Sequence, residues 1–271
     1  MTMNTDNFTN VTEWKHVSFS NAFMFRLVME SHELCKTFLE LVLDMKIAKL
    51  SHVDPEKSLE AKLSSKGVRL DLYIKDVNGV IFNLEMQASD IDKDALPKRT
   101  RYYQSMIDTN ALKKGAIYST LPSSIIVFVC KFDPFGLNLG RYTFSNFCHE
   151  NKKLELPDGS NKIFINTLGQ NESLSKGLIN LMEYINTGIV KDNFTEQINN
   201  RVEVLRDDAV SEQMYIMWQQ HDLEEQAKAE RKTIANVINR MLQRGDTDEE
   251  ILEIFPDLDK AKLAKIRQEN A

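Results

Sequence analysis

The feature that most constrains this chain is the segment from Val68 to Gln87, where two runs of alternating side chains flank the turn letters Asp-Val-Asn-Gly at 76–79. Alternation with a period of two predicts strands with one buried face, and the turn letters predict that the strands form a hairpin. Two loops are compatible with these letters. One is a two-residue type I′ loop at Asn-Gly, and the other is a three-residue loop in which a type I turn ends in a G1 bulge at Gly79.

The side-chain pattern favours the three-residue loop, which pairs Asp76 with Val80. In that register one face of the hairpin is wholly apolar: Leu70, Leu72, Ile74, Phe82, Leu84 and Met86. The other face is polar or amphipathic: Arg69, Asp71, Tyr73, Lys75, Ile81, Asn83, Glu85 and Gln87. A shift by one residue would mix the two faces, which is costly when one of them is buried.

The same register places Asp71 opposite Glu85, with Cβ atoms about 4.5–5.5 Å apart. Two carboxylates at that distance repel unless a cation lies between them or one is protonated. Hard oxygen donors suit Mg²⁺ or Mn²⁺, and such an ion can activate water and stabilise a phosphodiester transition state. The alternative is an exposed hairpin with unrelated surface charges, in which Lys75 or Arg69 is the partner. The spacing alone leaves both interpretations open.

Periodicity along the rest of the chain predicts an α/β domain followed by helices. Helices are expected within 20–43 and over 94–112, and the wholly apolar run at 124–130 predicts a buried strand. Weaker patterns predict a strand at 141–147 and an edge strand at 163–166, and the pattern is helical from Leu174 onward. We expect a domain of residues 1–200 and a helical extension of residues 201–271.

Composition excludes several classes of protein. The formal net charge of −6 leaves no global basic field, so contact with nucleic acid needs a local basic patch. The longest apolar run, residues 125–130, is far shorter than the roughly 20 residues of a membrane span. The polar start predicts no signal peptide, and three cysteines without a Cys-x-x-Cys pair predict reduced thiols in a cytoplasmic protein.

Five short motifs occur in a characteristic order. They are Phe-Ser-Asn-Ala-Phe-Met-Phe-Arg at 19–26, Arg-Leu-Asp-Leu-Tyr at 69–73, Asn-Leu-Glu-Met-Gln at 83–87, Leu-Pro-Lys-Arg-Thr-Arg-Tyr-Tyr-Gln at 96–104 and Gly-Ala-Ile-Tyr at 115–118. Each motif is weak by itself, but their order and spacing are specific. Together they resemble the PD-(D/E)xK nuclease superfamily, and within it the bacterial recombination-promoting nuclease (Rpn) and transposase family, over most of residues 18–190.

The resemblance implies a restriction-endonuclease-like α/β core, with a central mixed sheet flanked by helices, that cuts DNA with Mg²⁺ or Mn²⁺. Asp71 and Glu85 take the metal-ligand positions, and the backbone carbonyl of Met86 is a further expected ligand. Gln87 stands where the wider superfamily has Lys, a change that is usual in this family. Gln87 can orient the attacking water or contact phosphate, but it brings no positive charge, so the metal must carry more of the electrostatic stabilisation.

One departure from the family pattern concerns the first-helix motif, which commonly carries an acid and a Lys. Here Ala22 stands in place of the acid and Arg26 in place of the Lys. A third acidic ligand is therefore missing from this helix. Asn21, through its amide oxygen, and Glu40 on the next helix are possible auxiliary ligands, and a reduced affinity for metal is expected.

The expected helix at 94–112 carries basic residues in its first turns, where backbone N–H groups also favour anions. The resemblance implies that they bind DNA: Lys98, Arg99, Arg101, Tyr103 and Gln104. Arg99 would hydrogen-bond phosphate, while Tyr103 or Gln104 would position the strand. The alternative is a solvated basic helix end whose tyrosines pack into the core.

The tail from Asp222 to Ala271 holds twelve acidic and nine basic residues, which argues against a DNA-reading module. Its amphipathic positions are Ile234, Val237, Ile238, Met241 and Leu242. They predict packing against the nuclease domain or self-association, as a homodimer formed through the C-terminal helices.

Three functions remain in competition. The first is a metal-dependent DNA endonuclease that acts in recombination, mobile-element movement or phage defence. The second, motivated by Ala22, is a catalytically weak nuclease fold that acts as a DNA-binding or regulatory module. The third is an interaction protein that works through its tail. The carboxylate pair and the basic helix favour the first, and a transposase proper is less well supported because no separate basic domain is present.

Overall fold

The computed structural model describes residues 12–59, 67–170, 174–256 and 258–268. The chain forms two compact units, Met1–Glu212 and Gln213–Ala271. The expected boundary at residue 200 falls inside helix α5 (Asn193–Arg206), twelve residues before the point at which the units divide.

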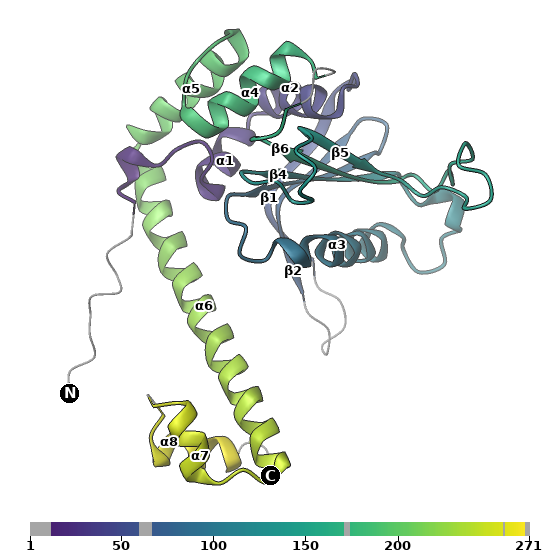
Figure 1. Ribbon diagram of the computed structural model, residues 1–271. Coiled ribbons are helices and arrows are strands. Elements are labelled where there is room, and N and C mark those ends of the chain that lie inside the picture. Colours follow the sequence, from purple (N-terminus) through teal and green to yellow (C-terminus); the bar gives the residue numbers. More distant parts are fainter. Residues whose placement is uncertain (1–11, 60–66, 171–173, 257, 269–271) are drawn as a thin grey trace. The chain divides into compact units, whose positions relative to one another are not determined.

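The first unit is built on a six-stranded mixed sheet with the order β1-β2-β3-β4-β6-β5 (Figure 1). Pairing is antiparallel from β1 to β3, parallel from β3 through β4 to β6, and antiparallel between β6 and β5. The strands are β1 (Leu50–Leu59), β2 (Val68–Asp76), β3 (Ile81–Gln87), β4 (Ser124–Cys130), β5 (Arg141–Phe144) and β6 (Ser160–Asn166).

Helices cover both faces of this sheet. One face carries α3 (Leu96–Ala111), and the other carries α1 (Ala22–Met29), α2 (His32–Leu43) and α4 (Lys176–Thr187), as Figure 1 shows. Helix α5 packs on α1, α2 and α4. Short 3₁₀ turns lie at Trp14–His16, Lys93–Ala95 and Tyr118–Thr120. Both faces of the central strands are therefore covered, as is typical of sheets with parallel strands.

The hairpin has the predicted three-residue loop. Lys75 pairs with Ile81, and the Asp76 amide donates to the Val80 carbonyl at 3.1 Å. Gly79 adopts a φ of 85°, the left-handed conformation that the G1 bulge requires. This confirms the register that places Asp71 opposite Glu85.

The centre of the polar face of the hairpin is buried rather than exposed to solvent. Glu85 is 1% exposed and Asn83 is fully buried. The interpretation of the hairpin as an exposed ribbon with unrelated surface charges is therefore wrong. A carboxylate at such a position needs a partner, because burying an unpaired charge is expensive.

Two strands differ from the expectation. The strand expected at 163–166 begins earlier, at Ser160, and it is not an edge strand, because β5 pairs with its outer side. Strand β1 was not predicted: it carries Pro55 and mostly charged or polar residues between its two leucine ends. It lies at the edge of the sheet, where a proline without an N–H is tolerated.

The second unit consists of the greater part of α6 (Ala209–Arg244) together with α7 (Asp248–Ile254) and α8 (Lys260–Gln268). Thr247 caps α7 in a capping box with Glu250. The predicted amphipathic face contributes to a small core formed by Ile238, Met241, Ile251 and Leu263.

In the parts of the chain that are described, no helix is both long and apolar enough to cross a membrane.

Candidate active site

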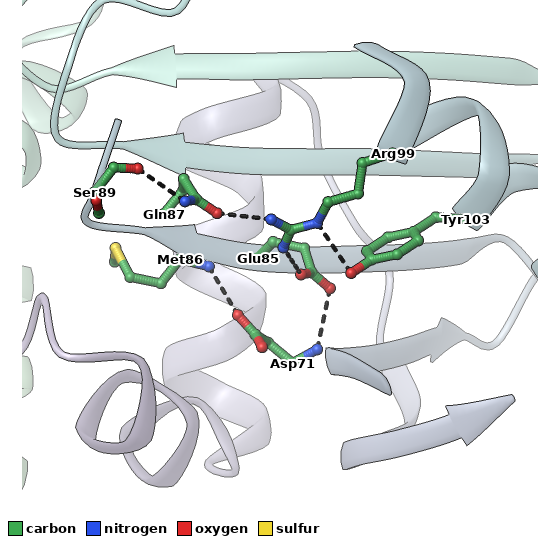
Figure 2. A network of polar contacts seen from close by, with 7 residues as sticks. All are labelled: Asp71, Glu85, Met86, Gln87, Ser89, Arg99 and Tyr103. Atoms are coloured by element: carbon green, nitrogen blue, oxygen red, sulfur yellow. Dashed lines mark hydrogen bonds and ion pairs between the residues drawn. The ribbon is translucent and has the colours of Figure 1, made fainter. Parts of the chain in front are cut away.

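The two predicted acids lie where the backbone ladder between β2 and β3 gives way to side-chain hydrogen bonds (Figure 2). The Asp71 amide donates to Oε1 of Glu85 at 3.0 Å, and the Met86 amide donates to Oδ2 of Asp71 at 3.1 Å. Each carboxylate therefore accepts an N–H group from the opposite strand. The strand pair itself holds the two acids side by side, as the hairpin register predicts.

A cation from α3 reaches this pair. The Arg99 guanidinium donates to Oε2 of Glu85 at 3.0 Å, to Oε1 of Gln87 at 2.8 Å and to the Tyr103 hydroxyl at 3.0 Å (Figure 2). It also lies over the Tyr103 and Phe128 rings, 5.3 and 4.8 Å from their centroids. All three guanidinium nitrogens have partners inside the site. Arg99 and Tyr103 share a helix face as predicted, and that face is turned toward the sheet.

The amide of Gln87 is oriented by its two neighbours. Its nitrogen donates to the Ser89 carbonyl at 2.8 Å, so its oxygen faces the Arg99 guanidinium. Gln87 brings no charge of its own, and the positive charge beside it comes from α3. Met86 lies buried between Glu85 and Gln87 on β3.

The electrostatics of the pair follow from burial. Burial raises the pKa of Asp71, and the Met86 amide and Arg99 offset this only in part. Burial raises the pKa of Glu85 as well, the neighbouring Asp71 charge raises it further, and Arg99 lowers it. Burial also raises the pKa of Tyr103, so its hydroxyl stays protonated at neutral pH. The two acids therefore share one bonded guanidinium, and the surrounding positive charges offset the desolvation of their ionised forms only in part.

Two further residues lie on the other side of Asp71: Arg26, which stands in place of the family Lys, and Glu56, which was not singled out from the sequence. Glu56 lies on β1 opposite Asp71, between the pairs Pro55–Leu72 and Lys57–Leu70, and it has a φ of 54°. It forms an ion pair with Arg26 of α1, whose side chain is 8% exposed. The Arg26 charge lowers the pKa of Asp71. Because β1 itself was not predicted, no signal in the sequence placed Glu56 here.

The two auxiliary ligands proposed from the sequence are engaged elsewhere. Asn21 caps α1, where its amide oxygen accepts from the Phe23 and Met24 amides at 2.9 and 3.3 Å. Glu40 accepts from Lys36 Nζ at 2.9 Å and from the Ile47 amide at 2.8 Å. The structure does not bring these oxygens together with the Asp71 and Glu85 carboxylates.

A basic groove of about 1110 Å³ is lined by Arg99 and Tyr103 of this network. Its lining residues are Gly67, Val68, Arg69, Asp92, Ala95, Lys98, Arg99, Arg101, Tyr102, Tyr103 and Ser105. Lys98 and Arg101 are exposed there. Of the predicted DNA contacts, Gln104 alone is buried in the core, where its amide bonds Ser124 and Asp108. The groove joins an exposed basic surface to the acid pair through Arg99.

The donor set fits a hard divalent cation with an incomplete protein shell. Asp71 and Glu85 supply carboxylate oxygens, and the neutral amide oxygen of Gln87 lies on the same guanidinium as Glu85. Within residues 12–59, 67–170, 174–256 and 258–268, no group of three or more His, Cys, Asp and Glu side chains is placed to hold a metal. Mg²⁺ usually keeps several waters and needs only one or two carboxylates. The guanidinium on Glu85 shows that a cation is accommodated at this position.

Comparison with known protein families supports the resemblance drawn from the sequence. The family model described as "PD-(D/E)XK nuclease family transposase" matches residues 20–265. This range includes β2, β3, α3 and the greater part of the second unit. No curated protein and no solved structure matches the chain significantly. The match confirms the resemblance that was drawn from the five sequence motifs.

Proposed function

Because the chain belongs to the PD-(D/E)XK nuclease family of transposases, we propose that it is a divalent-metal-dependent endodeoxyribonuclease that hydrolyses phosphodiester bonds. Its mixed sheet and flanking helices form a PD-(D/E)XK α/β core with a helical C-terminal extension. The observation that carries the proposal is the pair of carboxylates on adjacent strands, Glu85 buried and Asp71 partly buried, next to a basic groove.

Asp71, Glu85 and the Met86 carbonyl would hold Mg²⁺ or Mn²⁺ in this proposal. When bound, such an ion lowers the pKa of a coordinated water and stabilises charge on the phosphoryl oxygens. The Gln87 amide orients the water, since its oxygen faces the site while Ser89 fixes its nitrogen. Arg99 supplies the positive charge that Gln87 lacks in place of the superfamily Lys.

The groove would hold the DNA backbone. Lys98 and Arg101 are exposed on the first turns of α3, and Arg69 lines the same groove from β2. Such contacts give affinity without reading sequence, because they are made to phosphate. Dimerisation through the C-terminal helices, a cytoplasmic location and a role in recombination, mobile-element movement or phage defence belong to this proposal.

A plasmid-nicking assay tests the proposal. Wild type and Glu85→Ala are compared over a titration of Mg²⁺, Mn²⁺ and Ca²⁺, with EDTA as the metal-free control and Glu33→Ala as a control for loss of an exposed acid on α2. We expect nicking that requires metal and is lost only in Glu85→Ala. Nicking that survives in EDTA, or in Glu85→Ala, would refute the assignment.

A second candidate is a catalytically weak nuclease fold that binds DNA as a regulatory module. It is favoured by Ala22 at the start of α1 and by the engagement of Asn21 and Glu40 away from the acid pair. It predicts that the wild-type protein retains DNA in a gel-shift assay without nicking it at any metal concentration.

A further inference from the structure

Arg99 occupies the place in the candidate active site where a cation is needed. Its guanidinium bonds Glu85, which is a proposed metal ligand, and Gln87, which is the proposed water-orienting group (Figure 2). We propose that Arg99 is the counter-cation of the metal-free site and competes with a divalent ion for Glu85. Metal entry then turns the guanidinium into the adjoining groove, where it binds phosphate. This inference rests on the proposed function and adds a regulatory step to it.

Competition follows from the contacts of one oxygen. Oε2 of Glu85 lies 3.0 Å from Nη2 of Arg99, and Glu85 is only 1% exposed. Its other oxygen accepts the Asp71 amide at 3.0 Å. A metal ligand distance of about 2.0–2.1 Å at Oε2 would place a divalent ion against the guanidinium, and two cations repel strongly in a buried site. One cation is needed there to balance the acids, and two are not accommodated.

The position of Arg99 allows its guanidinium to move away from Glu85 and Gln87. Its side chain is 32% exposed although each of its three guanidinium nitrogens has a partner. It lines the basic groove together with Lys98 and Arg101, so a change of rotamer moves the guanidinium among other phosphate-binding groups. Guanidinium pairs well with phosphate oxygens, which can replace its bonds to Glu85 and Gln87.

This arrangement couples metal binding to DNA binding. Phosphate in the groove holds Arg99 away from Glu85 and thereby removes the competitor of the metal. By linkage, metal binding strengthens DNA binding by the same factor. Glu85 is paired with Arg99 in the metal-free state and with the divalent ion in the metal-bound state, so the buried carboxylate has a cationic partner in both.

The test measures Mn²⁺ binding to the full chain by isothermal titration calorimetry, with and without a phosphorothioate DNA duplex. Arg99→Met removes the competing charge and keeps an apolar stem, while Lys15→Met removes an exposed charge that does not line the groove. Without DNA, we expect Arg99→Met to bind Mn²⁺ about tenfold more tightly than wild type, the size of a typical coupling. Lys15→Met should bind as wild type does. Duplex DNA should tighten Mn²⁺ binding in wild type and in Lys15→Met, and leave it unchanged in Arg99→Met.

Equal or weaker Mn²⁺ binding by Arg99→Met would overturn the inference, and so would failure of all three proteins to bind Mn²⁺. A second measurement on the wild type does not depend on the folding of a variant. The Arg99 Nε–H resonance, assigned by comparison with Arg99→Lys, should shift to a solvent-averaged position when Mg²⁺ is added; an unchanged resonance would overturn the inference. Neither measurement reads cleavage, so a chain that passes both but cuts no DNA would refute only the proposed function.

Discussion

The backbone amide of Asp71 donates a hydrogen bond to the Glu85 carboxylate at 3.0 Å, so the two acids are joined by the strand pair that positions them. The return bond runs from the Met86 amide to Asp71 at 3.1 Å. These two bonds hold the carboxylates in place without help from a loop. Fixed carboxylates of this kind suit a site that stabilises charge developing in a transition state.

The metal-free protein should lose stability as the pH rises. The pKa values of Asp71 and Glu85 are both raised in the folded state, mainly by burial. Groups of this kind contribute stability that is fully present below the ordinary carboxyl pKa, about 4, and is lost as the pH rises through the folded pKa. We expect Tm in EDTA to fall from pH 5 to pH 8, and to fall less in Asp71→Asn. An equal slope in the two proteins would contradict the account of the pair.

Glu56→Gln should destabilise the first unit by about 2 kcal/mol, because it removes the charge of the carboxylate that contacts the buried Arg26 guanidinium directly. Urea denaturation measures the change. Arg69→Met is the matched control, since Arg69 is half exposed and lies 3.8 Å from Glu56, and its loss should cost less than about 1 kcal/mol. Equal costs for the two variants would show that burial of Arg26 does not decide the effect.

Lys98→Ala and Arg101→Ala should weaken DNA binding uniformly across sequences. Each removes an exposed cation from the groove, so each should reduce the slope of log K against log[salt] by about 0.9 for every duplex phosphate that the removed cation neutralised. Fluorescence anisotropy with two unrelated duplexes measures both effects. Lys15→Ala, exposed on the 3₁₀ turn at Trp14–His16, should change neither. Weakening confined to one duplex would indicate base readout instead.

Leu263→Ala should unfold the second unit selectively. Leu263 is 1% exposed in the small core with Ile238, Met241 and Ile251, and its truncation should cost about 3 kcal/mol. We expect rapid proteolysis within residues 234–268, and loss of the dimer in light scattering if the C-terminal helices form it. Nicking that persists in this variant assigns the chemistry to the first unit, whereas its loss would favour the tail as the working part.

The hairpin could be predicted because its two signals agree. The period of two and the turn letters at 76–79 select the same register, and that register fixes which acids face each other. The helix with Arg99 and Tyr103 on one face was predicted for a similar local reason. Helical spacing does not say whether such a face meets solvent or a sheet, so the inward turn of Arg99 required the structure.

The remaining parts depend on tertiary pairing. Strand β1 has no apolar alternation around Pro55, and it is a strand because β2 supplies its ladder. Glu56 joins the site only through that pairing. The short apolar run of β6 predicts an edge strand. In the structure β5 pairs with its outer side, and no local pattern in the sequence indicates that pairing.

The most direct measurement of the central claim is single-turnover cleavage of a labelled DNA duplex by wild type and by Asp71→Asn, in Mg²⁺ and in EDTA. Asn keeps the shape of the side chain and its acceptor for the Met86 amide, and it removes the charge that would hold the metal. We expect cleavage by wild type in Mg²⁺ alone, reduced by about a thousandfold or more in Asp71→Asn, a loss of about 4 kcal/mol of transition-state stabilisation. Equal rates in the two proteins, or wild-type cleavage that continues in EDTA, would contradict a metal-dependent nuclease site at Asp71 and Glu85.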